Sequence, residues 1–191
     1  MIYLKSAPKK TLNISPPKLL ALGFLSCICI GTILLKLPMA HYADLSWMDA
    51  LFTATSAVTI TGLSVINIGE SLTPFGQVVL LTLIQIGGLG FTTFAVLAAM
   101  SLSPNLGLRQ QLMVQDTLGQ TSLNKAVLIA KNVFLYTVFF QAIGILILTL
   151  LWLPEFPLST ALHYAIFYSI SSFNNAGFAL SPHGLVDFYQ D

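Results

Sequence analysis

The sequence predicts an all-α integral membrane protein that is built from repeated units of long helices and short, loop-ended helices. Its composition is the first reason, because 55% of the residues are hydrophobic and only 8% are charged, against about 25% charged residues in an average soluble domain. Three apolar runs are also long enough to cross a bilayer, which takes about 20 helical residues. Finally, two short segments, one with Gly62 and one with Gly177, have a similar residue pattern 115 residues apart.

The amino-terminal region combines a basic segment with the first expected membrane helix. Residues 1–18 contain four lysines and three prolines, and they are expected to lie outside the bilayer. The apolar run 19–37 is either a retained helix or a secretory signal peptide. It is longer than the apolar core of about 7–15 residues that is usual in a signal peptide, and residues 38–40 (Pro-Met-Ala) make a poor cleavage site. A retained helix is therefore favoured.

A first repeat is expected over residues 19–100. After the membrane helix, residues 46–49 (Ser-Trp-Met-Asp) resemble a capping box and open a helix of about ten residues, which is too short to cross the bilayer. Thr73 and Pro74 are typical of a helix start, with a capping side chain followed by proline in the first turn. They open a second long apolar run, which continues to Met100 without a charged residue.

An incomplete second repeat is expected over residues 128–191, after a polar connection at residues 101–127. The apolar run 128–153 is the third candidate membrane helix. Residues 159–172 again suit a short amphipathic helix. With the 115-residue offset, the chain ends where the closing helix of the second repeat would begin.

Charge placement predicts the orientation of the chain. The amino-terminal segment has four lysines, and residues 101–131 carry three basic residues against one acid, whereas the segments expected on the other side are acidic on balance. Basic loops stay in the cytoplasm. The amino terminus and residues 101–127 are therefore predicted to be cytoplasmic in a multi-pass protein of the cell membrane. Both short glycine-ended segments then dip into the bilayer from outside and return.

The two repeated segments are candidate parts of an ion-selective pore. Glycine permits the backbone angles of a carbonyl-lined strand, which a residue with a Cβ resists, and backbone carbonyls can replace the hydration shell of potassium. Irregular backbone of this kind is tolerated in the bilayer only where protein encloses it or where it lines a wet cavity. The offset that pairs the glycines also superposes Phe52 on Phe167 and Ser56 on Ser171. The residues predicted to bind potassium through their carbonyls are Thr59, Ile60, Thr61, Gly62, Asn174, Asn175, Ala176 and Gly177.

Side chains of these segments have predicted supporting roles. Thr59 and Thr61 offer additional hydroxyl oxygens, and Asn174 and Asn175 are expected to brace their loop by hydrogen bonds to neighbouring backbone. The short helices would direct their partly negative carboxy-terminal ends toward the pore, which favours a cation. Neither segment is specific alone, because a threonine-rich stretch with one glycine is common at helix contacts and Asn-Asn-Ala-Gly suits an ordinary turn. Their repetition at matching positions favours the filter interpretation.

Three ordered motifs resemble those of the Trk/Ktr/HKT potassium transporter family. Asp49–Leu63 resembles the first pore loop of the family, Gln85–Phe91 resembles the helix that follows it, and Ser172–Phe178 resembles the second pore loop. Together the motifs extend across nearly the whole chain. The resemblance is nearest to the bacterial Ktr membrane subunits of the family.

The resemblance implies potassium uptake through a pore of four helix–pore loop–helix repeats in one polypeptide. The implied partners are a second copy of the full-length membrane subunit, which makes a homodimer, and a cytosolic nucleotide-binding regulatory subunit. Glycine at the central filter position, as at Gly62 and Gly177, is the potassium-favouring choice of the family. Potassium is expected as the substrate and sodium as the candidate coupling ion, with no covalently bound cofactor.

The chain departs from the family pattern in its extent. It supplies two of the four pore loops and three spanning helices, so we expect a fragment of a longer protein or a truncated gene product. Two functions stay open. The chain is part of a potassium uptake system, or it is a structural piece of a membrane complex that does not transport alone.

Other function classes lack support in the sequence. The net charge of +1 comes with no basic face of the kind that nucleic acid requires. An intramembrane hydrolase needs a nucleophile beside a base, and no G-x-S-x-G motif is present. His163 lies more than two helical turns before Ser171 and Ser172, and it is interpreted as an interfacial residue. No catalytic residue and no enzyme are therefore predicted.

Polar residues and glycines inside the apolar runs are interpreted as packing features. Gln85, Asn132 and Gln141 are expected to form interhelical hydrogen bonds, since a buried amide needs a partner. Close packing of the second long helix against the short helix is favoured over a hinge for three glycines: Gly87, Gly88 and Gly90.

Overall fold

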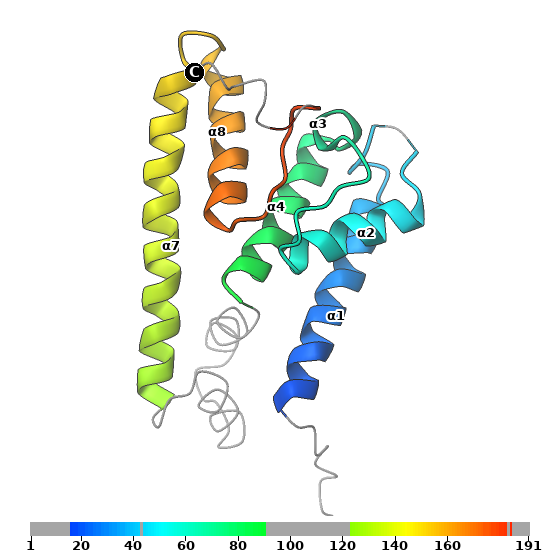
Figure 1. Cartoon of the computed structure of the whole chain (residues 1–191), viewed down its shortest axis with the longest axis vertical. Coiled ribbons are helices and arrows are strands. Elements are labelled where there is room, and N and C mark those ends of the chain that lie inside the picture. The colour runs from blue at the N-terminus through cyan, green and yellow to red at the C-terminus, as the bar shows by residue number, and fades with distance from the viewer. Residues whose placement is uncertain (1–15, 43, 91–122, 183, 185–191) are drawn as a thin grey trace, which may run out of the picture.

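The described part of the chain is helical, as predicted. The computed structural model describes residues 16–42, 44–90, 123–182 and 184. Within these residues, the only β-type pairing is an isolated bridge between His41 and Leu72. The remaining regular structure consists of the helices labelled in Figure 1.

The first group of helices begins with α1 (Pro16–Leu35) and α2 (Trp47–Val58), which crosses the end of α1 (Figure 1). The hydroxyl of Ser46 caps α2 and accepts the N–H of Asp49 at 3.1 Å. The predicted start of the first short helix is thereby confirmed.

The group continues with the single turn α3 (Ile68–Ser71) and with α4 (Pro74–Gly88). The Thr73 hydroxyl accepts the N–H of Gly76 at 3.2 Å, and Pro74 lies in the first turn. This predicted helix start is also confirmed. The expected continuation of the apolar run to Met100 lies outside the described residues.

The second group is an antiparallel pair, α7 (Leu123–Trp152) and α8 (Leu158–Phe173) (Figure 1). Within α7, Leu128–Trp152 is long and apolar enough to cross a membrane, while Leu20–Leu35 and Pro74–Gly88 are shorter apolar helices. At 16 residues, α8 is shorter than the usual membrane span.

Two helices begin earlier than the apolar pattern predicts. α1 starts at Pro16 instead of residue 19, because proline in a first turn gives up only an N–H that has no helical partner there. α7 starts at Leu123, within the segment that was expected to be a polar connection. Apolar periodicity marks the part of a helix that is buried or lipid-facing, and the helical backbone continues beyond it.

The core lies around α4, which packs against α1, α2 and α8. Val58 of α2, Leu80 and Ile84 of α4 and Phe167 of α8 are each at most 1% exposed. This packing brings together the two segments that follow the short helices. The first loop is defined as residues 59–63, after α2, and the second loop as residues 174–178, after α8.

Candidate functional site

The two loops share backbone angles at the positions that the sequence offset pairs. Left-handed angles occur at Ile60 and Asn175, where φ is 56° and 55°. They recur two residues later at Gly62 and Gly177, where φ is 78° and 72°. Glycine adopts this region freely, asparagine tolerates it, and a β-branched residue such as isoleucine rarely enters it.

Both short helices end in the same hydrogen-bonded turn. The N–H of Thr61 donates to the carbonyl of Ser56 at 2.9 Å, and the N–H of Ala176 donates to the carbonyl of Ser171 at 2.8 Å. This pairing, which spans a left-handed residue, is the Schellman ending of a helix. It turns the chain sharply out of each helix and into each loop.

The same two serines also hold the far end of each loop. The Ser56 hydroxyl accepts the N–H of Leu63 at 2.9 Å. At the equivalent positions, the Ser171 hydroxyl donates to the carbonyl of Phe178 at 2.7 Å. Both serines are at most 4% exposed, so each loop is fixed to its own short helix at both ends.

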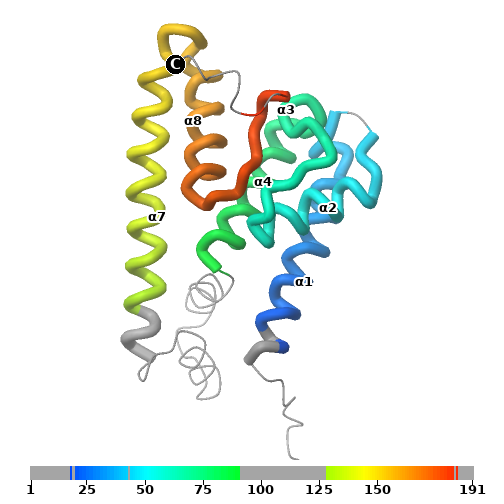
Figure 2. The backbone as a smooth tube through the Cα atoms, viewed as in Figure 1, coloured from blue at the N-terminus to red at the C-terminus, as the bar shows by residue number. Residues whose placement is uncertain are grey.

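The two loops lie side by side, as the tube in Figure 2 shows. A Cβ placed on Gly62 would lie 2.8 Å from the carbonyl oxygen of Ala176, and a Cβ placed on Gly177 would lie 3.1 Å from the Cα of Gly62. The approach is therefore between backbones, and it depends on the absence of side chains at both glycines. All eight predicted ion-binding residues belong to these adjacent loops.

The threonines of the first loop have hydroxyls that bond to one another. Thr59 donates to the carbonyl of Thr55 at 2.8 Å, and its hydroxyl lies 2.6 Å from that of Thr61. Both Thr59 and Thr61 are exposed. The first loop thus presents hydroxyl oxygens together with its backbone carbonyls.

The asparagines of the second loop differ from each other. Asn174 is 9% exposed, and its amide donates to the carbonyl of Ile170 at 2.9 Å and to Oε1 of Gln85 at 3.0 Å. The expected bracing of backbone is therefore present for Asn174. Asn175 is exposed, and in the described part of the chain no hydrogen bond joins its side chain to the loop.

Two of the three amides that were expected to form interhelical hydrogen bonds bond to each other in the structure. Gln141 of α7 donates to Gln85 of α4 at 2.8 Å, which confirms the expected interhelical bond for this pair, whereas Asn132 is exposed. Sequence reasoning missed Gln77 of α4, whose Oε1 lies 2.7 Å from Nε2 of His163 on α8. The requirement of a buried amide for a partner would have identified it.

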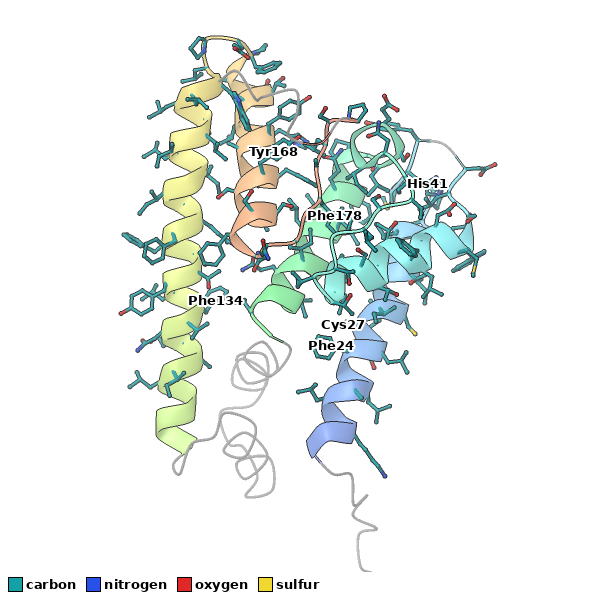
Figure 3. The ribbon with its side chains drawn as sticks, in the orientation of Figure 1. Phe24, Cys27, His41, Phe134, Tyr168 and Phe178 are labelled. Carbon is teal, nitrogen blue, oxygen red and sulfur yellow. The ribbon has the colours of Figure 1, made fainter. Side chains whose placement is uncertain are left out.

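Backbone and hydroxyl oxygens are the candidate cation ligands of this site. Among the described residues, no group of three or more histidine, cysteine or acidic side chains lies close enough together to hold a metal ion. α2 and α8 both end at the loops, and a helix carboxy terminus carries a partial negative charge. Phe178, labelled in Figure 3, is the last residue of the second loop and is 4% exposed between α8 and the first group of helices.

Replacement of Asn175 tests the left-handed turn. Asn175→Val is expected to lower the free energy of unfolding by about 1–2 kcal/mol, the penalty of left-handed backbone for a residue with a bulky Cβ. Asn175→Gly should leave it nearly unchanged, because glycine adopts these angles freely. Thermal unfolding of the purified protein in detergent measures both. Equal effects of valine and glycine would contradict the assigned conformation. Ile60 keeps the same angles in the first loop, where its side chain packs against the core.

Comparison with known proteins identifies the family. The TrkH model, described as "Cation transport protein", matches residues 21–191. The chain is 44% identical over 182 residues to Ktr system potassium uptake protein B of Bacillus subtilis. The aligned region covers 95% of this chain and 41% of that relative. The chain is 39% identical over 175 residues to Ktr system potassium uptake protein B of Vibrio alginolyticus, covering 92% and 38%.

A third relative carries a broader name. The chain is 35% identical over 188 residues to the potassium/sodium uptake protein NtpJ of Enterococcus hirae, covering 97% of this chain and 41% of that protein. The chain thus spans about two fifths of the length of these curated relatives. Both the family match and the identities extend over most of the chain, through both loops. The chain therefore belongs to the TrkH family of cation transport proteins, a family of membrane transporters and not of enzymes.

Proposed function

We propose that the chain is part of a potassium uptake system of the cell membrane and that the two loops line its selectivity filter. The observation that carries the proposal is the matched left-handed backbone of the two loops, which touch at Gly62 and Gly177. Two relatives are named as potassium uptake proteins. The candidate filter residues are Thr59–Gly62 and Asn174–Gly177.

The physical basis is the replacement of water by protein oxygens. A potassium ion enters a narrow pore when carbonyl oxygens substitute for its hydration shell at a similar energy. In an ordinary strand, side chains and carbonyls alternate in direction, whereas left-handed residues placed two apart change that alternation. The left-handed pairs in both loops therefore suit a segment that turns several carbonyls toward one axis.

The rigidity of the loops supports discrimination between ions. Each loop is fixed at its start by a Schellman turn and at its far end by a buried serine. A carbonyl ring that keeps its diameter favours the ion that fits it, although the number and field strength of the oxygens also contribute. In the family pattern four loops surround the ion, and these two supply half of that ring.

The proposal extends to partners and orientation by family resemblance. The lipid bilayer surrounds the chain, with the amino terminus in the cytoplasm. The full-length protein acts as a homodimer with a cytosolic nucleotide-binding regulatory subunit, and sodium is the candidate coupling ion. Charge placement supports the orientation, since residues 1–18 and 101–131 are basic on balance and basic segments stay in the cytoplasm.

Uptake measurements test the function. The complete reading frame that contains residues 1–191 should restore growth at low potassium, and rubidium uptake, in bacteria that lack their own potassium uptake systems. The 191 residues are also expressed alone, at equal membrane levels. Absence of rubidium uptake by them would support the alternative of a structural piece that does not transport by itself. Failure of the complete reading frame to restore uptake, despite its presence in the membrane, would count against the proposed function.

A further inference from the structure

A network of three amides joins three helical segments beside the second loop; Gln141 and Asn174 are buried and Gln85 is half-buried. Oε1 of Gln85 on α4 accepts two hydrogen bonds, one from Gln141 on α7 at 2.8 Å and one from Asn174 at 3.0 Å. Gln141 is 7% exposed and Asn174 is 9% exposed. Asn174 caps the end of α8 and is the first residue of the second loop, so Gln85 contacts the loop at its origin.

Asn174 uses both of its amide N–H donors in hydrogen bonds. A primary amide has two N–H donors, and those of Asn174 reach Gln85 and the carbonyl of Ile170. Loss of the Gln85 acceptor would leave donors of Asn174 and Gln141 without that partner, and both of these side chains are buried. An unsatisfied polar group is costly in such surroundings. Asn174 would therefore change position to find another acceptor.

The last turn of α4 also contacts both loops by close packing. A Cβ on Gly88 would overlap the Oδ1 atom of Asn174, and a Cβ on Gly87 would overlap the carbonyl oxygen of Val58 at the end of α2. The same Cβ on Gly87 would lie 2.9 Å from Cδ1 of Ile60 in the first loop. The favoured packing role of these two glycines thus places one turn of α4 against the origins of both loops.

The two loops depend on this turn to different degrees. At the position of Asn174, the first loop has Thr59, which bonds to Thr55 and Thr61 within its own segment. The second loop is instead tied to α4 and, through Gln141, to α7. A change at Gln85 should therefore act on the second loop directly.

We propose that Gln85 is a positioning residue of the filter: by holding Asn174 in a fixed place, it sets the path of the second loop against the first. This inference rests on the proposed function, because it concerns the same loops. Gln85 does not contact the ion in this scheme. It acts through Asn174, and its removal should change ion selectivity more than protein amount.

The test compares two glutamines of α4 that each bond to a residue of α8 or its cap. Gln85→Leu removes the acceptor beside the loop, whereas Gln77→Leu removes an amide that ties α4 to His163, near the start of α8. Both variants lose a contact between α4 and α8, so general destabilisation affects both. The measurement is rubidium uptake with sodium competition by the complete protein in cells, corrected for its amount in the membrane.

We expect Gln85→Leu to lower potassium selectivity over sodium by about tenfold, which corresponds to about 1.4 kcal/mol, and Gln77→Leu to leave the selectivity unchanged. Gln85→Glu keeps an acceptor at the same place and should retain most of the selectivity. Gln141→Leu removes only one donor from the network and should give a smaller loss of selectivity. This variant tests the inference if Gln85→Leu fails to reach the membrane. Unchanged selectivity in Gln85→Leu overturns the inference. If only Gln141→Leu reaches the membrane, unchanged selectivity in that variant overturns it. A change of selectivity in Gln77→Leu as large as that in Gln85→Leu also overturns it.

Gly62→Ser serves as the reference for the filter itself. If Gly62→Ser alters selectivity and the Gln85 variants do not, the positioning role fails while the proposed function stands. If neither change alters selectivity, the assignment of the loops as the filter fails with it.

Discussion

Replacement of Gly62 by serine in the complete protein is expected to lower the selectivity of uptake for potassium over sodium by about tenfold or more. Gly62 has φ of 78°, and a side chain in left-handed backbone costs about 1–2 kcal/mol. The new Cβ would also lie 2.8 Å from the carbonyl oxygen of Ala176. One loop must then move away from the other, and in the proposed filter a displaced carbonyl would no longer match the dehydrated ion. A change of about 1.4 kcal/mol in the difference between potassium and sodium binding is enough for a tenfold effect.

Gly184 provides a matched control for the conformational part of this effect. It also has left-handed backbone, with φ of 67°, but a Cβ there meets no described residue within 4 Å. Gly184→Ser should therefore leave selectivity unchanged, while Gly177→Ser should resemble Gly62→Ser. Rubidium uptake at increasing sodium concentrations measures all three. Unchanged uptake and unchanged sodium competition in Gly62→Ser would remove Gly62 from the filter.

Local sequence signals predicted local structure well. Ser46 and Thr73 cap helices as their residue types predict. A capping hydroxyl needs only the N–H groups of the next turn. The offset of 115 residues likewise pairs Ser56 with Ser171, and these serines close equivalent turns in the structure. Such features depend on short stretches of chain, so a single sequence contains the information.

Contacts between distant segments were less accessible from the sequence. The bond between Gln85 and Asn174 joins residues 89 positions apart, and an amide in an apolar run shows that a partner is needed without showing which one. The left-handed angle of Asn175 suits its residue type, whereas that of Ile60 opposes it. Tertiary packing of the Ile60 side chain stabilises its left-handed angle, and such packing cannot be predicted from the local sequence.

The pair Phe52 and Phe167 shows the same limit, because equivalent positions in the repeat have different surroundings. Phe167 is 1% exposed, and its ring meets that of Tyr168 edge-on with centroids 6.0 Å apart. Phe52, at the matching position of α2, is 40% exposed. Each short helix packs against two others, α8 against α7 and α4, and α2 against α1 and α4. Phe52 lies on a side of α2 that the described residues leave exposed.

Phe167→Ala is accordingly expected to lower the free energy of unfolding by about 3 kcal/mol, near the lower end of the range for buried phenylalanine. The lower end applies because lipid is as apolar as the protein interior. The lost contacts and the cavity then remain as the main cost. Phe52→Ala should lower the free energy of unfolding by about 1 kcal/mol or less, because much of the Phe52 ring is not buried. Denaturation of the purified protein in detergent compares the two. An equal loss in both variants would mean that Phe52 is covered in the assembled protein, which would contradict the open face of α2 and assign a contact surface to it.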